Sequence, residues 1–255
     1  MAEISHPASD PPALTALRAL VARGAAGELA KDRFVPLHPA VASLLGVAGL
    51  QRGTTVLVEE AAYPGATSLA LTLLTEATSQ GMWCAVLGLP ELGLAAAAEL
   101  GICLDRLVIV PGVPGREAMF LTTLLEACDI VCAVLAQPLS GLDARRLVAR
   151  VRERRGVLVV VPAPQLRRVV RRRLWPELSD LTMTVMHARF VGLEEGEGRI
   201  GARLVEVALR RRRAPEERRG RLWLPARGGG VTLADGADAL EADVPVGMSR
   251  VALGR

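Results

Sequence analysis

The chain has 255 residues, of which 51% are hydrophobic and 23% charged, and its formal net charge is only +4. So many apolar residues can bury a sizeable core, which excludes wholesale disorder, and the small net charge does not by itself indicate a nucleic-acid-binding protein. All but one of the 31 lysine and arginine residues are arginines. A run of arginines in this sequence is therefore weak evidence of a binding site.

The cysteines and the apolar runs indicate the cellular compartment. Cys84, Cys103, Cys128 and Cys132 lie mostly in or beside apolar runs and form no C-x-x-C pair. Buried free thiols are typical of a reducing cytosol. No basic-then-apolar leader is present and the apolar runs are too short for a bilayer span. We expect a soluble, cytoplasmic protein.

Three regions follow from the pattern along the chain. Residues 1–33 predict a polar arm followed by a helix, on which Leu14, Leu17 and Leu20 share one stripe. Residues 34–225 predict an α/β domain. Residues 226–255 contain three consecutive glycines and few hydrophobic residues, so a flexible C-terminal tail is expected, although part of 231–240 has the apolar content to fold back.

Apolar strands alternate with helical segments between residues 54 and 161. Continuous apolar runs separated by helices predict a parallel sheet covered on both faces. Residues 181–191 and 202–209 instead alternate apolar and polar positions, with one more short strand at 221–224. The fold class predicted is therefore α/β, with a mainly parallel sheet, helices on both faces and an antiparallel C-terminal extension.

The stretch from Thr54 to Ser79 combines a β-branched strand, a turn with Pro64 and Gly65, and a helix. Strand, turn and helix in this order form the setting of a phosphate-binding P-loop, G-x-x-x-x-G-K-[ST]. On that pattern Gly65 is the second glycine and Thr67 the hydroxyl residue. Glu60 replaces the first glycine and Ala66 replaces the lysine, so the frame is present and its phosphate-binding residues are not.

The order of elements resembles the RecA core over roughly residues 45 to 190. The resemblance runs through VLVEEAAYPGATSLAL, WCAVLGLPELGLAAAAELGICLDRLVIV, CDIVCAV, VLVVV and LTMTV. In length and in its Arg- and Ala-rich composition the chain also resembles the small RecA-like mutagenesis accessory proteins of the ImuA family, in particular their actinobacterial ImuA-prime type. The resemblance implies a RecA-like P-loop fold with degenerate nucleotide-binding motifs.

Aligned with that family, two further catalytic positions are apolar. Leu89 stands where the resemblance implies a water-activating glutamate, with Glu91 nearby, and Val134 stands where it implies a magnesium-ordering aspartate. Together with Ala66, these changes remove three parts of the machinery that a RecA-type ATPase requires. We expect a pseudo-ATPase that is not an enzyme and takes no cofactor or metal.

The ImuA resemblance implies a non-catalytic adaptor in an error-prone translesion DNA synthesis complex, the mutasome of the SOS response to DNA damage. The implied partner is an ImuB-like Y-family polymerase homologue and, through it, an error-prone C-family polymerase and the sliding clamp. Two alternatives stay open. One is a SulA-like inhibitor of cell division that binds a tubulin-like division protein. The other is a nucleotide hydrolase in which an arginine replaces the lysine.

Five arginines near residue 170 form a possible nucleic-acid or partner surface, namely Arg167, Arg168, Arg171, Arg172 and Arg173. A phosphate backbone would accept them, with weak DNA contact expected, but a solvated helix face in an arginine-rich protein explains them equally well. The run Arg210–Arg213 has the same two interpretations.

Ser140 and Asp143 indicate a helix N-cap, as do Thr67 and Ser68. The three histidines are scattered, so they support neither a metal site nor a catalytic triad.

Overall fold

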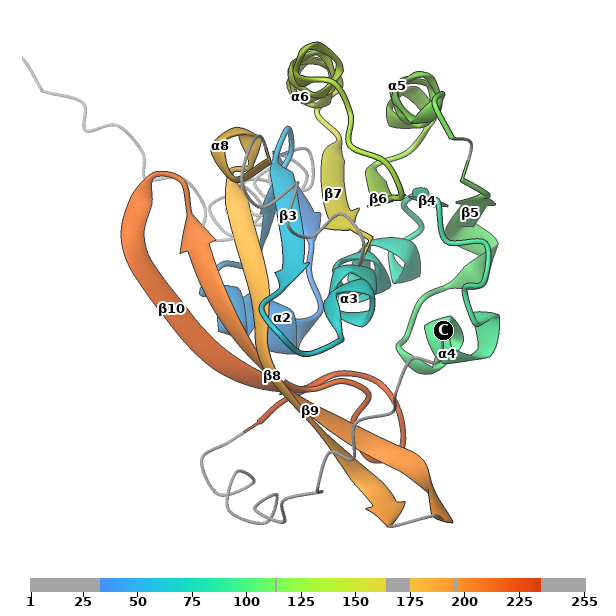
Figure 1. Ribbon diagram of the computed structural model, residues 1–255, viewed down its shortest axis with the longest axis vertical. Coiled ribbons are helices and arrows are strands. Elements are labelled where there is room, and N and C mark those ends of the chain that lie inside the picture. The colour runs from blue at the N-terminus through green and yellow to red at the C-terminus, as the bar shows by residue number, and fades with distance from the viewer. Residues whose placement is uncertain (1–32, 113, 164–174, 195–196, 235–255) are drawn as a thin grey trace, which may run out of the picture.

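The computed structural model describes residues 33–112, 114–163, 175–194 and 197–234, which form a nine-stranded sheet covered by helices (Figure 1). The strand order is β11-β10-β9-β8-β3-β7-β6-β4-β5. Strands β3 to β8 pair with one another in parallel, and β9, β10 and β11 continue the sheet from β8 in antiparallel pairing. The predicted fold class is confirmed, and this arrangement is consistent with a RecA-like core.

The bounds of the strands follow the apolar runs closely in the parallel part. The parallel strands are β3 (Thr55–Glu60), β4 (Cys84–Leu87), β5 (Leu107–Val110), β6 (Ile130–Leu135), β7 (Val157–Pro162) and β8 (Leu181–Glu194). The antiparallel strands are β9 (Glu197–Arg211), β10 (Ala214–Trp223) and β11 (Thr232–Leu233). A separate antiparallel pair consists of β1 (Phe34–Pro36) and β2 (Gly49–Gln51).

Two helical layers cover the sheet, and each encloses a hydrophobic cluster. One layer contains α2 (Pro39–Leu45), α3 (Ala66–Ser79) and α4 (Leu94–Glu99), followed by the short 3-10 helix η1 (Leu104–Arg106). The other contains α5 (Glu117–Ala127), α6 (Gly141–Arg154) and α8 (Trp175–Leu178). Because side chains alternate across a strand, Val56 and Val58 of β3 pack in the first cluster and Leu57 packs in the second.

The helix α3 lies at the centre of the first layer and is buried along most of its length. Three of its polar residues, Thr72, Thr75 and Thr78, are also buried. Their hydroxyls donate hydrogen bonds to carbonyl oxygens of the preceding turn of the same helix. Burial of these threonines therefore leaves none of their hydroxyl donors unsatisfied, so the helix can bury its polar positions as well as its apolar ones.

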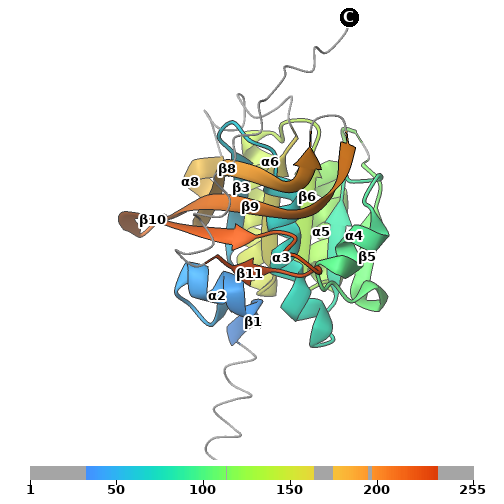
Figure 2. The ribbon, with the colours of Figure 1, turned by 90° about the horizontal axis from the view of Figure 1, so that it is seen from below.

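The sheet continues beyond the expected domain boundary at residue 225. Strand β11 pairs with β10, and Ala226 and Val231 are buried. Figure 2 shows β11 next to β10, with α2 beside them. Residues 226–234 thus belong to the domain, and residues 235–255 of the expected tail lie outside the described ranges, as do residues 1–32 of the expected N-terminal arm and helix. The expected strand at 221–224 is also too short, because β10 begins at Ala214.

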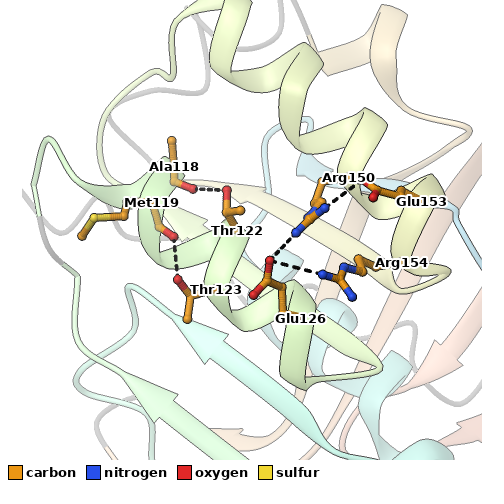
Figure 3. Close-up of polar contacts among 8 residues, drawn as sticks. All are labelled: Ala118, Met119, Thr122, Thr123, Glu126, Arg150, Glu153 and Arg154. Carbon is orange, nitrogen blue, oxygen red and sulfur yellow. Dashed lines mark hydrogen bonds and ion pairs between the residues drawn. The ribbon is translucent and has the colours of Figure 1, made fainter.

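An arginine joins helices α5 and α6 of the second layer (Figure 3). Arg150 of α6 donates hydrogen bonds to Glu126 of α5 and to Glu153, and Arg154 lies 3.6 Å from Glu126. The hydrogen bond from Arg150 holds the pKa of the Glu126 carboxyl below its usual range. Both ends of this cluster face solvent, so it orients α5 against α6 more than it stabilises the fold.

Within the described residues, none of the helices has both the length and the apolar character needed to cross a bilayer.

The four cysteines are free, and three of them are buried. Burial raises the pKa of Cys132 to about 12 and also raises the pKa of Cys84 and Cys128. Cys103 is partly exposed.

We expect a thiol reagent at pH 8 to modify Cys103 first in the folded protein, because the other thiols are shielded and bind their proton more tightly. Mass spectrometry of a labelling time course measures this order, and Cys103→Ser is the control that should remove the fast phase. Equally fast labelling of Cys84 would contradict the packing described for β4.

Candidate functional site

The candidate site is the turn between β3 and α3. Strand β3 lies inside the sheet between β7 and β8, and its carboxyl end leads through residues 61–65 into the first turn of α3. The first backbone amides of a helix have no partner within the helix, which makes such a turn a natural binding site for an anion. Gly65 precedes the helix with φ 149°, a conformation that favours glycine. The local geometry of the P-loop pattern therefore remains.

A side chain of the protein itself occupies the anion position of this turn. The Oε1 atom of Glu60 accepts hydrogen bonds from the backbone amides of Gly65 and Ala66, at 2.7 and 2.9 Å. Glu60 is only 8% exposed. A carboxylate bonded to two consecutive amides at a helix start makes the contacts that a phosphate oxygen would make there. The residue that replaces the first glycine thus supplies the acceptor that a phosphate would supply in a P-loop.

The expected capping residues of α3 are not the ones that the structure uses. The helix begins at Ala66 and its N-cap is Gly65, so Thr67 and Ser68 lie inside the first turn instead of at the cap. The acceptor for the first amides is the Glu60 carboxylate. The prediction for α6 is confirmed, because Ser140 is the N-cap and its hydroxyl accepts from the amide of Asp143 at 3.1 Å.

An arginine from β9, which the sequence pattern did not indicate, lies beside the same turn. A Cβ atom added to Gly65 would stand 3.8 Å from Nη1 of Arg203. The Nε of Arg203 donates to the carbonyl of Leu224 at 2.9 Å. Burial lowers the pKa of Arg203, and the negative charge of Glu60 opposes that shift. The turn therefore combines two amides, an internal carboxylate and a cation contributed by a distant strand.

The two other positions that the RecA resemblance singled out are apolar and packed. Leu89, just after β4, and Val134, near the end of β6, both pack against the first hydrophobic cluster. The backbone is tight here, because a Cβ on Gly88 would come within 2.2 Å of the Val134 carbonyl oxygen. Glu91 is exposed in the loop that follows β4. The described residues include no group of three or more His, Cys, Asp or Glu side chains arranged to hold a metal ion.

The arginines at 167–173 lie outside the described residues, so their expected role as a surface stays a prediction. The run Arg210–Arg213 is described. It spans the end of β9 and the turn to β10. Because Arg211 pairs with Leu181, the run lies at the end of the sheet where β8 begins.

The sheet and the turn into α3 define an α/β protein whose arrangement is consistent with a RecA-like core, and the comparisons with known proteins agree with this. Residues 43–167 match the family model described as the MT3502 N-terminal domain. That segment begins in α2 and contains β3, α3 and the strands as far as β7.

Two curated proteins are similar to parts of the chain. An uncharacterized protein, Rv3395c, from Mycobacterium tuberculosis (strain ATCC 25618 / H37Rv) is 35% identical over 98 residues, 38% of this chain and 48% of that protein. Protein RecA from Wolbachia sp. subsp. Brugia malayi (strain TRS) is 31% identical over 107 residues, 42% of this chain and 30% of RecA. The chain thus spans about half or less of the curated relatives it matches, and its similarity to RecA is distant.

The Glu60 contacts generate a stability prediction. Glu60→Ala leaves the amides of Gly65 and Ala66 without their acceptor, so we expect the free energy of unfolding to fall by about 1–3 kcal/mol. Glu60→Gln should cost less, since its amide oxygen still accepts from both donors. Urea unfolding measures these differences, with the exposed Glu91→Ala as the matched control near zero. If Glu60→Ala were as stable as Glu91→Ala, the carboxylate would not hold the turn.

Proposed function

We propose that this protein is a non-catalytic RecA-like adaptor in an error-prone translesion DNA synthesis complex that acts in the DNA damage response. The observation that carries the proposal is the Glu60 carboxylate bonded to the amides of Gly65 and Ala66. A RecA-like protein whose phosphate-binding amides are bound to its own side chain keeps the fold as a scaffold. The distant similarity to RecA and the ImuA-like length and composition of the chain support the mutasome as the complex in which it acts.

ATP binding at this turn would have to displace Glu60. The incoming phosphate would meet a carboxylate, and two like charges ~4 Å apart repel by roughly 4 kcal/mol near a protein surface. Ala66 offers no side-chain cation, and Leu89 and Val134 offer no acid to order magnesium or water. These residues together disfavour both nucleotide binding and hydrolysis.

Arg203 is the cation that a nucleotide-hydrolase reading would need. It reaches the turn from β9, but its Nε is bonded to the Leu224 carbonyl and its charge faces Glu60. A half-buried guanidinium that already balances a buried carboxylate has little free capacity for a phosphate. We therefore assign Arg203 to charge balance within the adaptor and not to catalysis.

An adaptor also requires a docking surface, and the edge strand β5 fits this role. It is the last strand of the sheet, so its outer edge pairs with no other described strand. Ile109 of β5 is 36% exposed, Leu104 in the turn before β5 is 37% exposed, and Trp83, which precedes the neighbouring β4, is 43% exposed. Arg106 stacks on the Trp83 ring at 5.0 Å. Open strand edges with apolar side chains invite pairing with an extended segment of another protein. We propose that an ImuB-like Y-family protein, which connects to the C-family polymerase and the sliding clamp, docks here.

The first test concerns nucleotide. We expect calorimetric titration with ATP and Mg²⁺ to give no saturable signal, because Glu60 occupies the amides and Ala66 supplies no cation. The double change Glu60→Gly and Ala66→Lys rebuilds the loop pattern but leaves Leu89 and Val134 apolar, so hydrolysis should remain at background. Micromolar ATP binding by the unmodified protein that Thr67→Ala abolishes would overturn the non-catalytic assignment.

The second test concerns the partner. We expect Ile109→Arg to weaken binding to a purified ImuB-like protein by at least roughly tenfold, because it introduces a charge into the apolar edge. Leu233→Arg is the matched control: Leu233 is 41% exposed on β11, at the opposite edge of the sheet. Biolayer interferometry with and without ATP measures both affinities, and nucleotide should change neither. Tight binding that Ile109→Arg does not alter would exclude the β5 edge, and absence of binding by the unmodified protein would contradict the adaptor role.

A further inference from the structure

A basic cleft lies at the opposite end of the parallel strands from the Glu60 turn. Its volume is about 820 Å³, and its lining includes Thr54, which precedes β3, and Asp180, which precedes β8. Five arginines and one exposed aromatic residue line the same cleft, namely Arg52, Arg152, Arg211, Arg212, Arg213 and Phe34. In Figure 1 the start of β8 and the turn from β9 to β10 lie at the same end of the sheet, away from the turn into α3.

A second, smaller cleft of about 390 Å³ adjoins the first. The two share Arg211 and Arg212 in their walls, and the second adds Arg210. The hydroxyl of Ser179, which also lines the second cleft, is buried and has no hydrogen-bond partner among the described residues. The arginine run at the end of β9 therefore separates two adjoining hollows and supplies positive charge to both.

The charges in these clefts are only partly balanced. Asp180 lies 2.6 Å from Arg212 and 3.9 Å from Arg152, and its other oxygen accepts from the amide of Thr55. Arg52 pairs with Asp129 at 2.9 Å. Arg213 has no ion pair within the described ranges, and one aspartate is shared by two arginines. The clefts thus keep a surplus of positive charge that a ligand with several negative groups would neutralise.

Three features point to one class of ligand. The arginines are spread over two adjoining clefts, which suits a chain of phosphates better than one small anion. Guanidinium groups form paired hydrogen bonds to phosphate oxygens. Phe34 is 42% exposed in the larger cleft, and an aromatic face beside a basic groove is the combination that binds single strands, because unpaired bases stack on the ring while phosphates contact the cations.

We propose that this cleft binds single-stranded nucleic acid, with Arg152 and the arginines of the β9 end on the phosphates and Phe34 under a base. The site uses neither the Glu60 turn nor the β5 edge. It does not include the arginines at 167–173, which lie outside the described residues. Failure of this inference would leave the proposed adaptor role unaffected, and failure of the adaptor role would leave this site intact.

The test measures binding of a fluorescein-labelled oligothymidylate by anisotropy, with the full chain, at several salt concentrations. The variant Arg152→Ala with Arg213→Ala removes two cleft charges that are not needed for the fold. We expect at least roughly tenfold weaker binding at low salt, and a salt slope that is shallower by about 1.4, since a single strand gives about 0.7 per neutralised phosphate.

Arg145→Ala with Arg146→Ala is the matched control. Both arginines are exposed on α6 and line neither cleft, and the change in net charge is the same. This control should keep the wild-type affinity and slope, and circular dichroism checks that both variants are folded. Equal losses in the two double variants would show that only net charge matters and would overturn the proposal, as would unchanged binding in the cleft variant.

Two further measurements separate a single strand from a small anion. Phe34→Leu preserves apolar volume but removes the ring, and we expect it to weaken oligothymidylate binding several-fold at every salt concentration. Inorganic phosphate, at matched ionic strength, should compete no better than chloride. Millimolar competition by phosphate with no effect of Phe34→Leu would identify a small-anion site and overturn the assignment to nucleic acid.

Discussion

The two hydrogen bonds from Gly65 and Ala66 to the Glu60 carboxylate are the constraint on which the central unit depends. A turn that presents backbone amides to a phosphate leaves those amides without a partner when the phosphate is absent, and buried unpaired amides are costly. The Glu60 side chain, at the end of β3, removes that cost because it accepts hydrogen bonds from both amides at the start of α3. A site for an external ligand has thereby become an internal connection between strand and helix.

The internal connection in turn explains why the antiparallel extension belongs to the same unit as the parallel core. A carboxylate that is 8% exposed needs more than two amides to offset the loss of water. Arg203 of β9 supplies a nearby positive charge and is itself held by the Leu224 carbonyl just after β10. The extension beyond β8 is therefore coupled electrostatically to the β3–α3 turn, although residues 43–167 alone match the family model.

The sequence predicted what depends on local pattern and missed what depends on distant contacts. Strands β5 and β6 coincide with continuous apolar runs of the sequence, and the replacement of the P-loop glycine and lysine follows from one motif. The first half of β10 was missed because Pro215, Glu216 and Glu217 give no apolar alternation, and β11 because it has only two residues. Neither the caps of α3 nor Arg203 could be predicted, since one depends on the shape of the turn and the other on a strand far along the chain.

The two ends of the parallel strands differ in how their charges are balanced. Ligands of open α/β sheets normally bind at the carboxyl ends of the strands, but here the carboxylate of Glu60 already satisfies that end. At the amino ends, Asp180 is shared by Arg152 and Arg212, and the arginine run of β9 exceeds the acids around it. A fold does not determine function, because sites can be added to it or lost. On the proposed function, the carboxyl end of the strands serves as a scaffold, and the proposed capacity for phosphate lies at the amino end.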